Sequence, residues 1–194
     1  MSRKLLEYPE NLPSGFFVKS NPMWFAAVAE VCHNMRADEI EQHMQFFAAG
    51  APISDYDPRI AAVGIVNLGG VAFFGLDKKT HKAYVVGGYA PDPGNPGCWK
   101  SWMAGTNDGW NLHWRDITRA TRWVMGQLLD GGARRLETNC MASRTDAQKW
   151  YTDFLGMKLE GELRDYCPNG EALRMYSVTQ REWRERFGVD DGQQ

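Results

Sequence analysis

The stretch that decides the fold runs from Cys98 to Trp123 and reads CWKSWMAGTNDGWNLHWRDITRATRW. A loop at 90–97, with three prolines and two glycines in eight residues, leads into a strand expected at 98–106. From Trp114 onward, apolar side chains recur at helical spacing, and three arginines fall on the opposite side at about 100° per residue. Asn111 is placed to cap this helix. The stretch therefore predicts a tryptophan-rich strand followed by a strongly amphipathic helix.

Shorter elements flank this stretch on both sides. Before it, the pattern predicts a strand at 15–20, helices at 22–35 and 37–49, and strands at 59–68, 70–77 and 82–89. After it come a strand at 134–140, a helix at 143–156, a hairpin of 157–166 and 171–178 around the turn CPNG, and a last short helix with the capping box Thr179–Glu182. We therefore predict an α/β (α+β) fold, in which one mixed, mostly antiparallel sheet of six to seven strands is flanked by about four helices.

Length and charge fit a single globular domain. The chain has 194 residues and a formal net charge of -2. We assign 1–14 to an N-terminal arm, 15–178 to the domain, and 179–194 to a C-terminal helix and tail. The lack of a basic excess argues against nucleic acid and against an anionic membrane surface as partners.

The four cysteines are scattered along the chain and form no CxxC pair. No group of histidines and cysteines has the spacing of metal ligands, so we expect no metal site. We see no signal peptide and no long apolar run, and we therefore expect free thiols in the reducing cytoplasm.

Two motifs in the second half carry a family resemblance. Arg115-Asp-Ile-Thr118-Arg-Ala120 is similar to the [Arg/Gln]-x-x-Gly-x-[Gly/Ala] loop that opens a helix in the GNAT superfamily of acetyl-CoA-dependent N-acetyltransferases, with Thr118 in place of the middle glycine. The segment 143–178 resembles the closing helix, strand, turn and strand of that superfamily. The likeness extends from about Gly15 to Val178 and is most specific over Trp99–Val178.

The resemblance implies a GNAT-like fold and acetyl-CoA as the acyl donor. Backbone N–H groups at the start of the helix would bind the diphosphate, and the preceding strand would pair with the amide-bearing arm of the donor. Arg144-Thr-Asp-Ala147 stands where the family has Asn-x-x-Ala. The residues implied in binding acetyl-CoA are Trp102, Met103, Ala104, Arg115, Asp116, Ile117, Thr118, Arg119, Ala120 and Arg144.

Many family members protonate the leaving thiolate with a tyrosine four residues before a glycine that corresponds to Gly156. Thr152 occupies that position here, and Tyr151 precedes it. In an α-helix this shift of one residue rotates the side chain by about 100°, so Tyr151 would face the core beside Ala147 and Phe154. Tyr151 is nevertheless the candidate general acid.

Two carboxylates are candidates for the general base. Glu39 belongs to the second helix, which lines the acceptor cleft in the family, and Glu137 belongs to the strand at 134–140. A solvated acidic face accounts equally well for Glu39 and its neighbours Asp38 and Glu41.

Within the superfamily, the W-x-x-W-M strand and the arginine-rich helix are most similar to a branch encoded by tailed bacteriophages. That branch includes acyltransferases and internal virion proteins. The resemblance implies transfer of an acetyl group to an amine of unknown identity, with a homodimer as one option. The alternative is a catalytically inactive GNAT-fold protein that binds a protein partner or enters the virion, and the changes at Thr118, Thr152 and Arg144 favour it.

Overall fold

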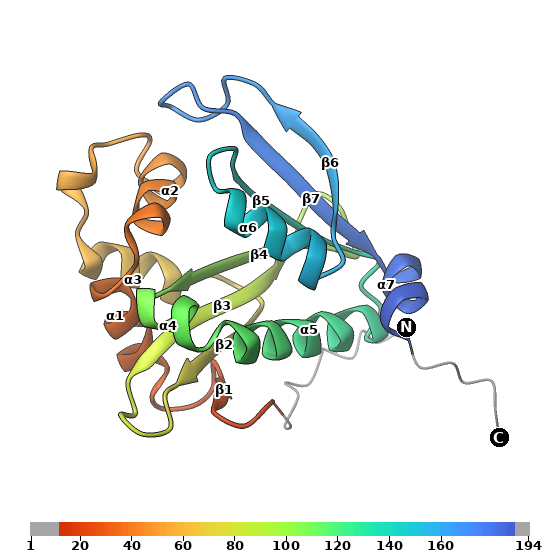
Figure 1. Ribbon diagram of the computed structural model, residues 1–194, viewed down its shortest axis with the longest axis horizontal. Helices are drawn as coiled ribbons and strands as arrows, with labels where there is room; N and C mark the ends of the chain where they lie inside the picture. The colour runs from red at the N-terminus through yellow and green to blue at the C-terminus, as the bar shows by residue number, and fades with distance from the viewer. Residues whose placement is uncertain (1–11, 189–194) are drawn as a thin grey trace.

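Seven strands form one sheet in the order β1-β2-β3-β4-β5-β7-β6 (Figure 1). The computed structural model describes residues 12–188, so most of the expected N-terminal arm and the end of the expected tail lie outside it. The strands are β1 (Phe16–Val18), β2 (Val71–Leu76), β3 (Ala83–Pro91), β4 (Cys98–Gly105), β5 (Arg135–Met141), β6 (Lys158–Leu163) and β7 (Leu173–Thr179). All neighbours are antiparallel except β4 and β5. The predicted fold class is confirmed.

Helices cover both faces of the sheet. They are α1 (Trp24–His33), α2 (Ala37–Phe47), α3 (Pro58–Val66), α4 (Asn107–Leu112), α5 (Trp114–Asp130), α6 (Thr145–Lys149) and α7 (Gln180–Phe187), with a 3-10 turn η1 (Ile53–Asp55) and a π-helix η2 (Trp150–Phe154). The described residues thus hold seven α-helices instead of about four. Part of the excess is α4, a short helix within the connection where Asn111 was expected to act only as a cap.

The strand predicted at 59–68 is wrong, because these residues form α3. Asp57 caps the helix by accepting the N–H of Arg59 at 2.8 Å, and Pro58 takes the first helical position, where its missing N–H is not needed. Ala61 and Ile65, four residues apart, are buried. A short apolar run can fit either a strand or a buried helix, and these local signals at its start decide for the helix.

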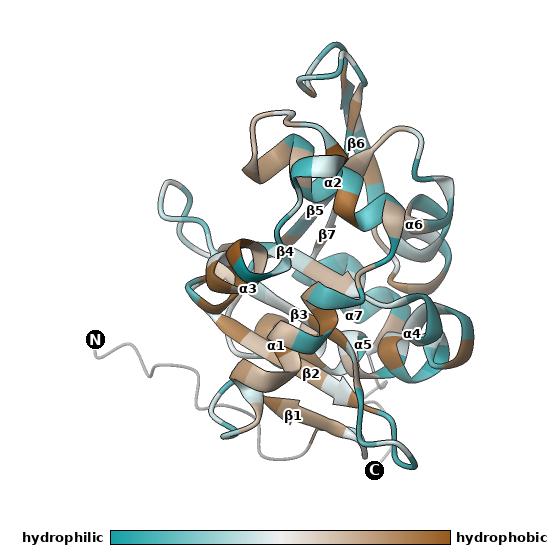
Figure 2. Ribbon diagram, turned by 90° about the vertical axis from the view of Figure 1, so that its left-hand side faces the viewer, coloured by the Kyte–Doolittle hydropathy of each residue, from teal (hydrophilic) through white to brown (hydrophobic). Residues whose placement is uncertain are grey.

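Alternating side chains divide the core between the two faces of the sheet. On β2, Phe73 belongs to a cluster with the apolar face of α5, whereas Phe74 belongs to a cluster with α1 and α3. Adjacent residues of a strand point to opposite faces, so one strand contributes to both clusters. Figure 2 shows the hydrophobic colour concentrated in β1–β3 and α1.

Two local predictions for the second half of the chain are confirmed, the hairpin turn CPNG and the capping box at Thr179. The turn CPNG joins β6 and β7 into a hairpin, with Gly170 at a φ of +83°. Thr179 caps α7, and its side chain and that of Glu182 form the reciprocal capping box. All four cysteines are buried free thiols, and no helix of residues 12–188 is both long and apolar enough to cross a membrane.

One irregularity of the sheet creates the site. β4 and β5 are paired only from Cys98 to Lys100 and from Arg135 to Glu137. Each strand then continues, β4 to Gly105 and β5 to Met141, without pairing to the other. The two strands therefore separate like the arms of a V, and the space between the arms is available to side chains and ligands.

Candidate functional site

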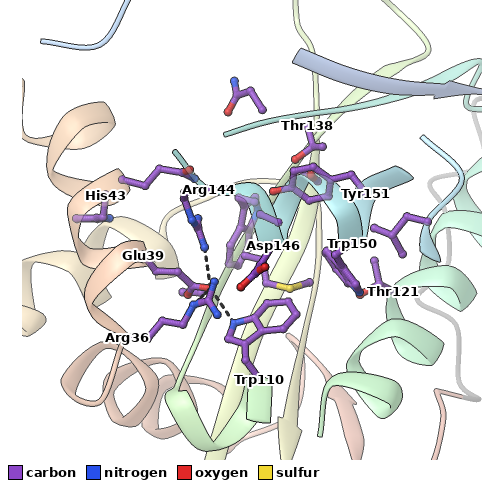
Figure 3. A pocket seen from close by; sticks show the side chains of 18 of the residues that line it. Arg36, Glu39, His43, Trp110, Thr121, Thr138, Arg144, Asp146, Trp150 and Tyr151 are labelled. Carbon is purple, nitrogen blue, oxygen red and sulfur yellow. Dashed lines mark hydrogen bonds and ion pairs between the residues drawn. The ribbon is translucent and has the colours of Figure 1, made fainter. Parts of the chain in front are cut away.

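A cavity of about 490 Å³ opens where β4 and β5 separate. Its walls come from β3, β4 and β5, from α2 and α4, and from α6 and η2 (Figure 3). The charged side chains in the wall are Arg36, Glu39, Arg144, Asp146 and Lys149. Segments more than one hundred positions apart in sequence thus meet around one cavity.

The backbone of β4 forms one edge of the cavity. The Gly105 N–H donates to Glu39 Oε2 at 2.5 Å, and the Gly105 carbonyl accepts the Arg36 N–H at 3.2 Å, so Gly105 faces away from β3. Alternate residues of an antiparallel strand direct their N–H and C=O groups to the same side. The backbone N–H and C=O of Met103 therefore point toward the cleft, whereas the backbone N–H and C=O groups of Trp102 and Ala104 point toward β3. All three line the cavity, and Met103 offers it a backbone donor and acceptor.

Glu39 is buried at the centre of a charge cluster that Asp38 connects to the solvent. Its Oε1 atom accepts the indole N–H of Trp110 at 2.8 Å and lies 3.3 Å from Arg36 Nε and 3.5 Å from Arg144 Nη2. Asp38 adds a second carboxylate, 2.7 Å from Arg36 and 3.2 Å from Arg144. Two carboxylates thus balance two guanidinium groups.

The position of Glu39 makes it a connector. Burial raises the pKa of the Glu39 carboxyl, and the charges of Arg144 and Arg36 oppose that effect. Both of its oxygens are engaged, so Glu39 joins α2 to the end of β4 and to α4. Arg144, expected among the acetyl-CoA ligands, is 8% exposed and points at Glu39 and Asp38.

Tyr151 lines the cavity because the helix after α6 widens into a π-turn. The Leu155 N–H donates to the Trp150 carbonyl at 3.1 Å, five residues back, and Gly156 ends the helix at a φ of +71°. A π-turn accommodates one residue more than an α-turn. The separation of five residues between Tyr151 and Gly156 therefore gives Tyr151 the orientation that a separation of four residues would give in a regular α-helix. The expected packing of Tyr151 against the core, beside Ala147, is present, but Tyr151 lines the cavity as well, which a regular helix did not predict.

The surroundings of Tyr151 hold its phenol in the protonated form. Its ring lies 5.8 Å from that of Trp150 and 5.4 Å from that of Tyr176. Burial, and then the nearby Cys140 thiol, raise the pKa of Tyr151 to about 12. Tyr151 is thus a proton donor that faces the cavity at neutral pH (Figure 3).

The six-residue motif lies within the first turns of α5 and not in a loop. Ile117, Thr118 and Ala120 are buried, whereas Arg115 and Arg119 are exposed. Arg119 pairs with Asp116 at 3.3 Å. Within residues 12–188, the cavity wall takes Trp114 and Thr121 from α5 and none of 115–120. The N–H groups of the first helical turn, at 114–116, are the ones that an α-helix leaves without intrahelical acceptors.

Thr118 has a defined role in this arrangement. Its hydroxyl donates to the Trp114 carbonyl at 2.7 Å and accepts the indole N–H of Trp150 at 2.8 Å. Trp150 in turn meets Trp110 edge to face at 5.2 Å. The side chain at the position of the family glycine therefore fixes η2 to α5.

Glu137 does not reach the cavity wall. It pairs with Arg135 at 2.6 Å on the part of β5 that is still bonded to β4.

Sequence reasoning missed two other groups in the wall, His43 and Asp146. Burial lowers the pKa of His43, and among residues 12–188 no cation pairs with Asp146. His43 belongs to no motif, and Asp146 stands at a variable position of Arg144-Thr-Asp-Ala147, so their presence in one cavity wall depends on how α2 and α6 lie across the cleft.

Comparisons with known proteins bear on this architecture. No family model matches the sequence, and no curated protein matches it. Solved structures do match: the acetyltransferase (GNAT family) from Bacillus anthracis is 12% identical, with 88% of this chain and 98% of that chain covered and a TM-score of 0.63. The GCN5-related N-acetyltransferase from Brucella melitensis is 14% identical, with 97% and 90% covered and a TM-score of 0.65.

A third match is the ribosomal-protein-S18-alanine N-acetyltransferase from Escherichia coli, 13% identical, with 84% of this chain and 93% of that chain covered and a TM-score of 0.58. Identities this low establish the fold alone. The chain has the fold of the GNAT acetyltransferases.

Proposed function

We propose that this protein transfers an acetyl group from acetyl-CoA to the nitrogen of an amine. The observation that carries the proposal is the cavity between the separated ends of β4 and β5, where the backbone of Met103 and the hydroxyl of Tyr151 both face one space. An acyl-transfer site needs a donor for the thioester oxygen and an acid for the leaving thiolate, and these two groups supply them.

The roles follow from the geometry. The Met103 N–H would polarise the thioester carbonyl, and the amine would attack the carbonyl carbon. As the carbon–sulfur bond breaks, the Tyr151 hydroxyl would donate its proton to the sulfur. The proton lost by the amine would return to the Tyr151 oxygen through solvent, which balances the cycle.

The acyl donor would occupy two parts of the site. Its amide-bearing arm would lie along the free edge of β4, and its diphosphate at the first turn of α5, close to the exposed Arg115 and Arg119. In this arrangement residues 116–120 would not contact the diphosphate and would belong to the helix that presents the first-turn N–H groups. Arg144 would not contact acetyl-CoA and would stabilise the wall of the cleft through its ion pair with Glu39.

The acceptor end of the cavity favours an amine that carries an apolar group. His43, Phe46 and Phe47 of α2 line this end, and the ring of Phe47 is 66% exposed. The Asp146 carboxylate borders the same space (Figure 3). A protonated amine would be attracted to Asp146 and would release one proton to solvent before it attacks as the neutral amine, and the apolar group would contact the rings of α2.

Calorimetric titration with acetyl-CoA, followed by a CoA-release assay with a panel of amines, tests the proposal. Tyr151→Phe should bind acetyl-CoA as tightly as the wild-type protein and release CoA about a hundredfold more slowly. Tyr166→Phe, on the exposed hairpin loop, is the matched control. If millimolar acetyl-CoA gives no heat and no CoA is released with any amine, the proposal is wrong.

One feature favours the second candidate, a GNAT-fold protein without turnover that binds a protein partner. Contacts between Trp110 and Trp150 and between Trp114 and Phe154 bridge the gap between the α4–α5 segment and η2. Acetyl-CoA binding would have to coexist with these aromatic pairs.

A bacteriophage origin, with cytoplasmic or virion location, stays a proposal from the W-x-x-W-M strand, and mass spectrometry of purified virions tests it. Homodimer formation is a further proposal, which sedimentation measures.

A further inference from the structure

Three successive carbonyl groups at the end of η2 are bound by arginines from distant elements. Arg186 of α7 donates to the Thr152 carbonyl at 3.3 Å and to the Asp153 carbonyl at 3.0 Å. Arg122 of α5 donates to the Phe154 carbonyl at 2.5 Å. The last carbonyls of a helix lack intrahelical donors and form its negative end, so cations are favoured there.

The two guanidinium groups share one platform. Both lie over the ring of Phe187, Arg122 at 4.8 Å and Arg186 at 5.4 Å. A Cβ atom at Gly156 would lie 2.8 Å from the Phe187 ring, so Phe187 also packs directly against the residue that ends η2. The neighbouring Trp183 is buried and anchors α7 to α5. We call Arg122, Arg186 and Phe187 the α7 clamp.

Tyr151 lies between two points at which its helix is fixed. On the N-terminal side, the Trp150 indole is bound to the Thr118 hydroxyl. On the C-terminal side, the α7 clamp binds the carbonyls of residues 152–154, and the Met157 N–H donates to the Tyr151 carbonyl itself at 3.0 Å. A π-turn is rare and is retained only where the surroundings stabilise it.

We propose that α7, through Arg186 and its partners in the clamp, stabilises the π-turn and thereby positions the Tyr151 hydroxyl in the cavity. The C-terminal helix is then part of the catalytic apparatus without contacting the substrate. The inference rests on the proposed acyl transfer, in which Tyr151 is the acid. If the helix relaxed to regular α-geometry, Tyr151 would rotate by about 100°, away from the site.

The test compares Arg186→Met, which removes every donor and keeps the apolar stem, with Arg184→Met on the same helix. The Arg184 side chain is exposed and forms no hydrogen bond or ion pair among residues 12–188, and this variant should keep wild-type kinetics. Arg186→Met should lower kcat about tenfold and leave the KM for acetyl-CoA unchanged, because only the placement of the acid is altered. Arg186→Lys, which keeps one donor group, should recover part of the rate.

A double-mutant cycle separates positioning from a general structural effect. In a Tyr151→Phe background, Arg186→Met should change kcat by less than about twofold, because the acid that it positions is absent. An equal fold-loss in both backgrounds, a loss confined to KM, or an unchanged kcat in Arg186→Met would overturn the proposal.

Amide hydrogen exchange provides a readout that does not depend on activity. The Leu155 N–H closes the π-turn and the Met157 N–H binds the Tyr151 carbonyl, and the exchange of both should accelerate in folded Arg186→Met and stay unchanged in Arg184→Met. Unchanged exchange in Arg186→Met would overturn the role of the clamp. A wild-type protein that transfers no acetyl group while Arg186→Met still accelerates this exchange would overturn the proposed reaction and leave the clamp itself supported.

Discussion

The carboxylate of Glu39 on α2 accepts the backbone N–H of Gly105, the last residue of β4, at 2.5 Å across a sequence separation of 66 residues. The contact holds the open arm of β4 in place after β4 has left β5. It thus couples the charge cluster to the shape of the cleft.

Glu39→Gln should lower the free energy of unfolding by about 3 kcal/mol, because Arg36 and Arg144 would be left with one carboxylate between them in a buried site. Urea denaturation measures this change. Glu41→Gln, on the same helix and without an ion pair in the described structure, should change the value by less than about 0.5 kcal/mol. A loss in Glu39→Gln no larger than in this control would contradict the connector role.

Thr118→Val should destabilise the protein by about 1 to 2 kcal/mol, although it preserves the volume of the side chain. The change removes the acceptor of the Trp150 indole N–H and a donor to the Trp114 carbonyl. Thr118→Ser keeps the hydroxyl and should recover most of the loss in the same urea experiment. Equal stabilities of the Val and Ser variants would show that this hydroxyl contributes nothing.

Gly156→Ala should destabilise the protein by about 1 to 2 kcal/mol, because Gly156 has a φ of +71° and its Cβ atom would lie 2.8 Å from Phe187 and 3.0 Å from Arg186. The opposite sign is expected for Gly64→Ala in the middle of α3, where no heavy atom lies within 4 Å of the added Cβ. That variant should gain up to about 1 kcal/mol from helix propensity. Thermal unfolding of both variants measures whether Gly156→Ala is less stable, and Gly64→Ala more stable, than the wild-type protein.

Glu182 should make stability depend on pH in the acidic range. A hydrogen bond from Lys158, and then bonds from the N–H and hydroxyl of Thr179, lower the pKa of Glu182 to about 2. A depressed pKa contributes stability above the unfolded value, near 4.5, and this stability is lost as the pH falls toward 2.

Glu182→Gln should therefore cost about 1 kcal/mol at pH 7, and the difference from the wild-type protein should shrink below about pH 4.5. Glu185→Gln, whose exposed carboxylate lies 3.7 Å from Arg181, should follow the wild-type curve. A difference between wild type and Glu182→Gln that stays constant from pH 7 to pH 3.5 would disprove this assignment.

Much of the fold could be predicted from local patterns. The amphipathic face of α5, the turn CPNG and the capping box at Thr179 are set by residues within one or two turns of each other, so their signals stand in the sequence. Pattern alone failed at residues 59–68, where an apolar run fits strand and helix alike, and it did not foresee α4.

The sequence by itself determined the order of the main elements and the polarity of each face, because these depend on side-chain periodicity and on caps. Only the tertiary structure decided the site. The rotation of Tyr151 depends on one extra residue in a helical turn, which Arg122 and Arg186 stabilise from other elements. The meeting of Glu39 with Arg144, 105 residues apart, depends on how α2 packs across the cleft, and side-chain periodicity contains no information about such distant contacts.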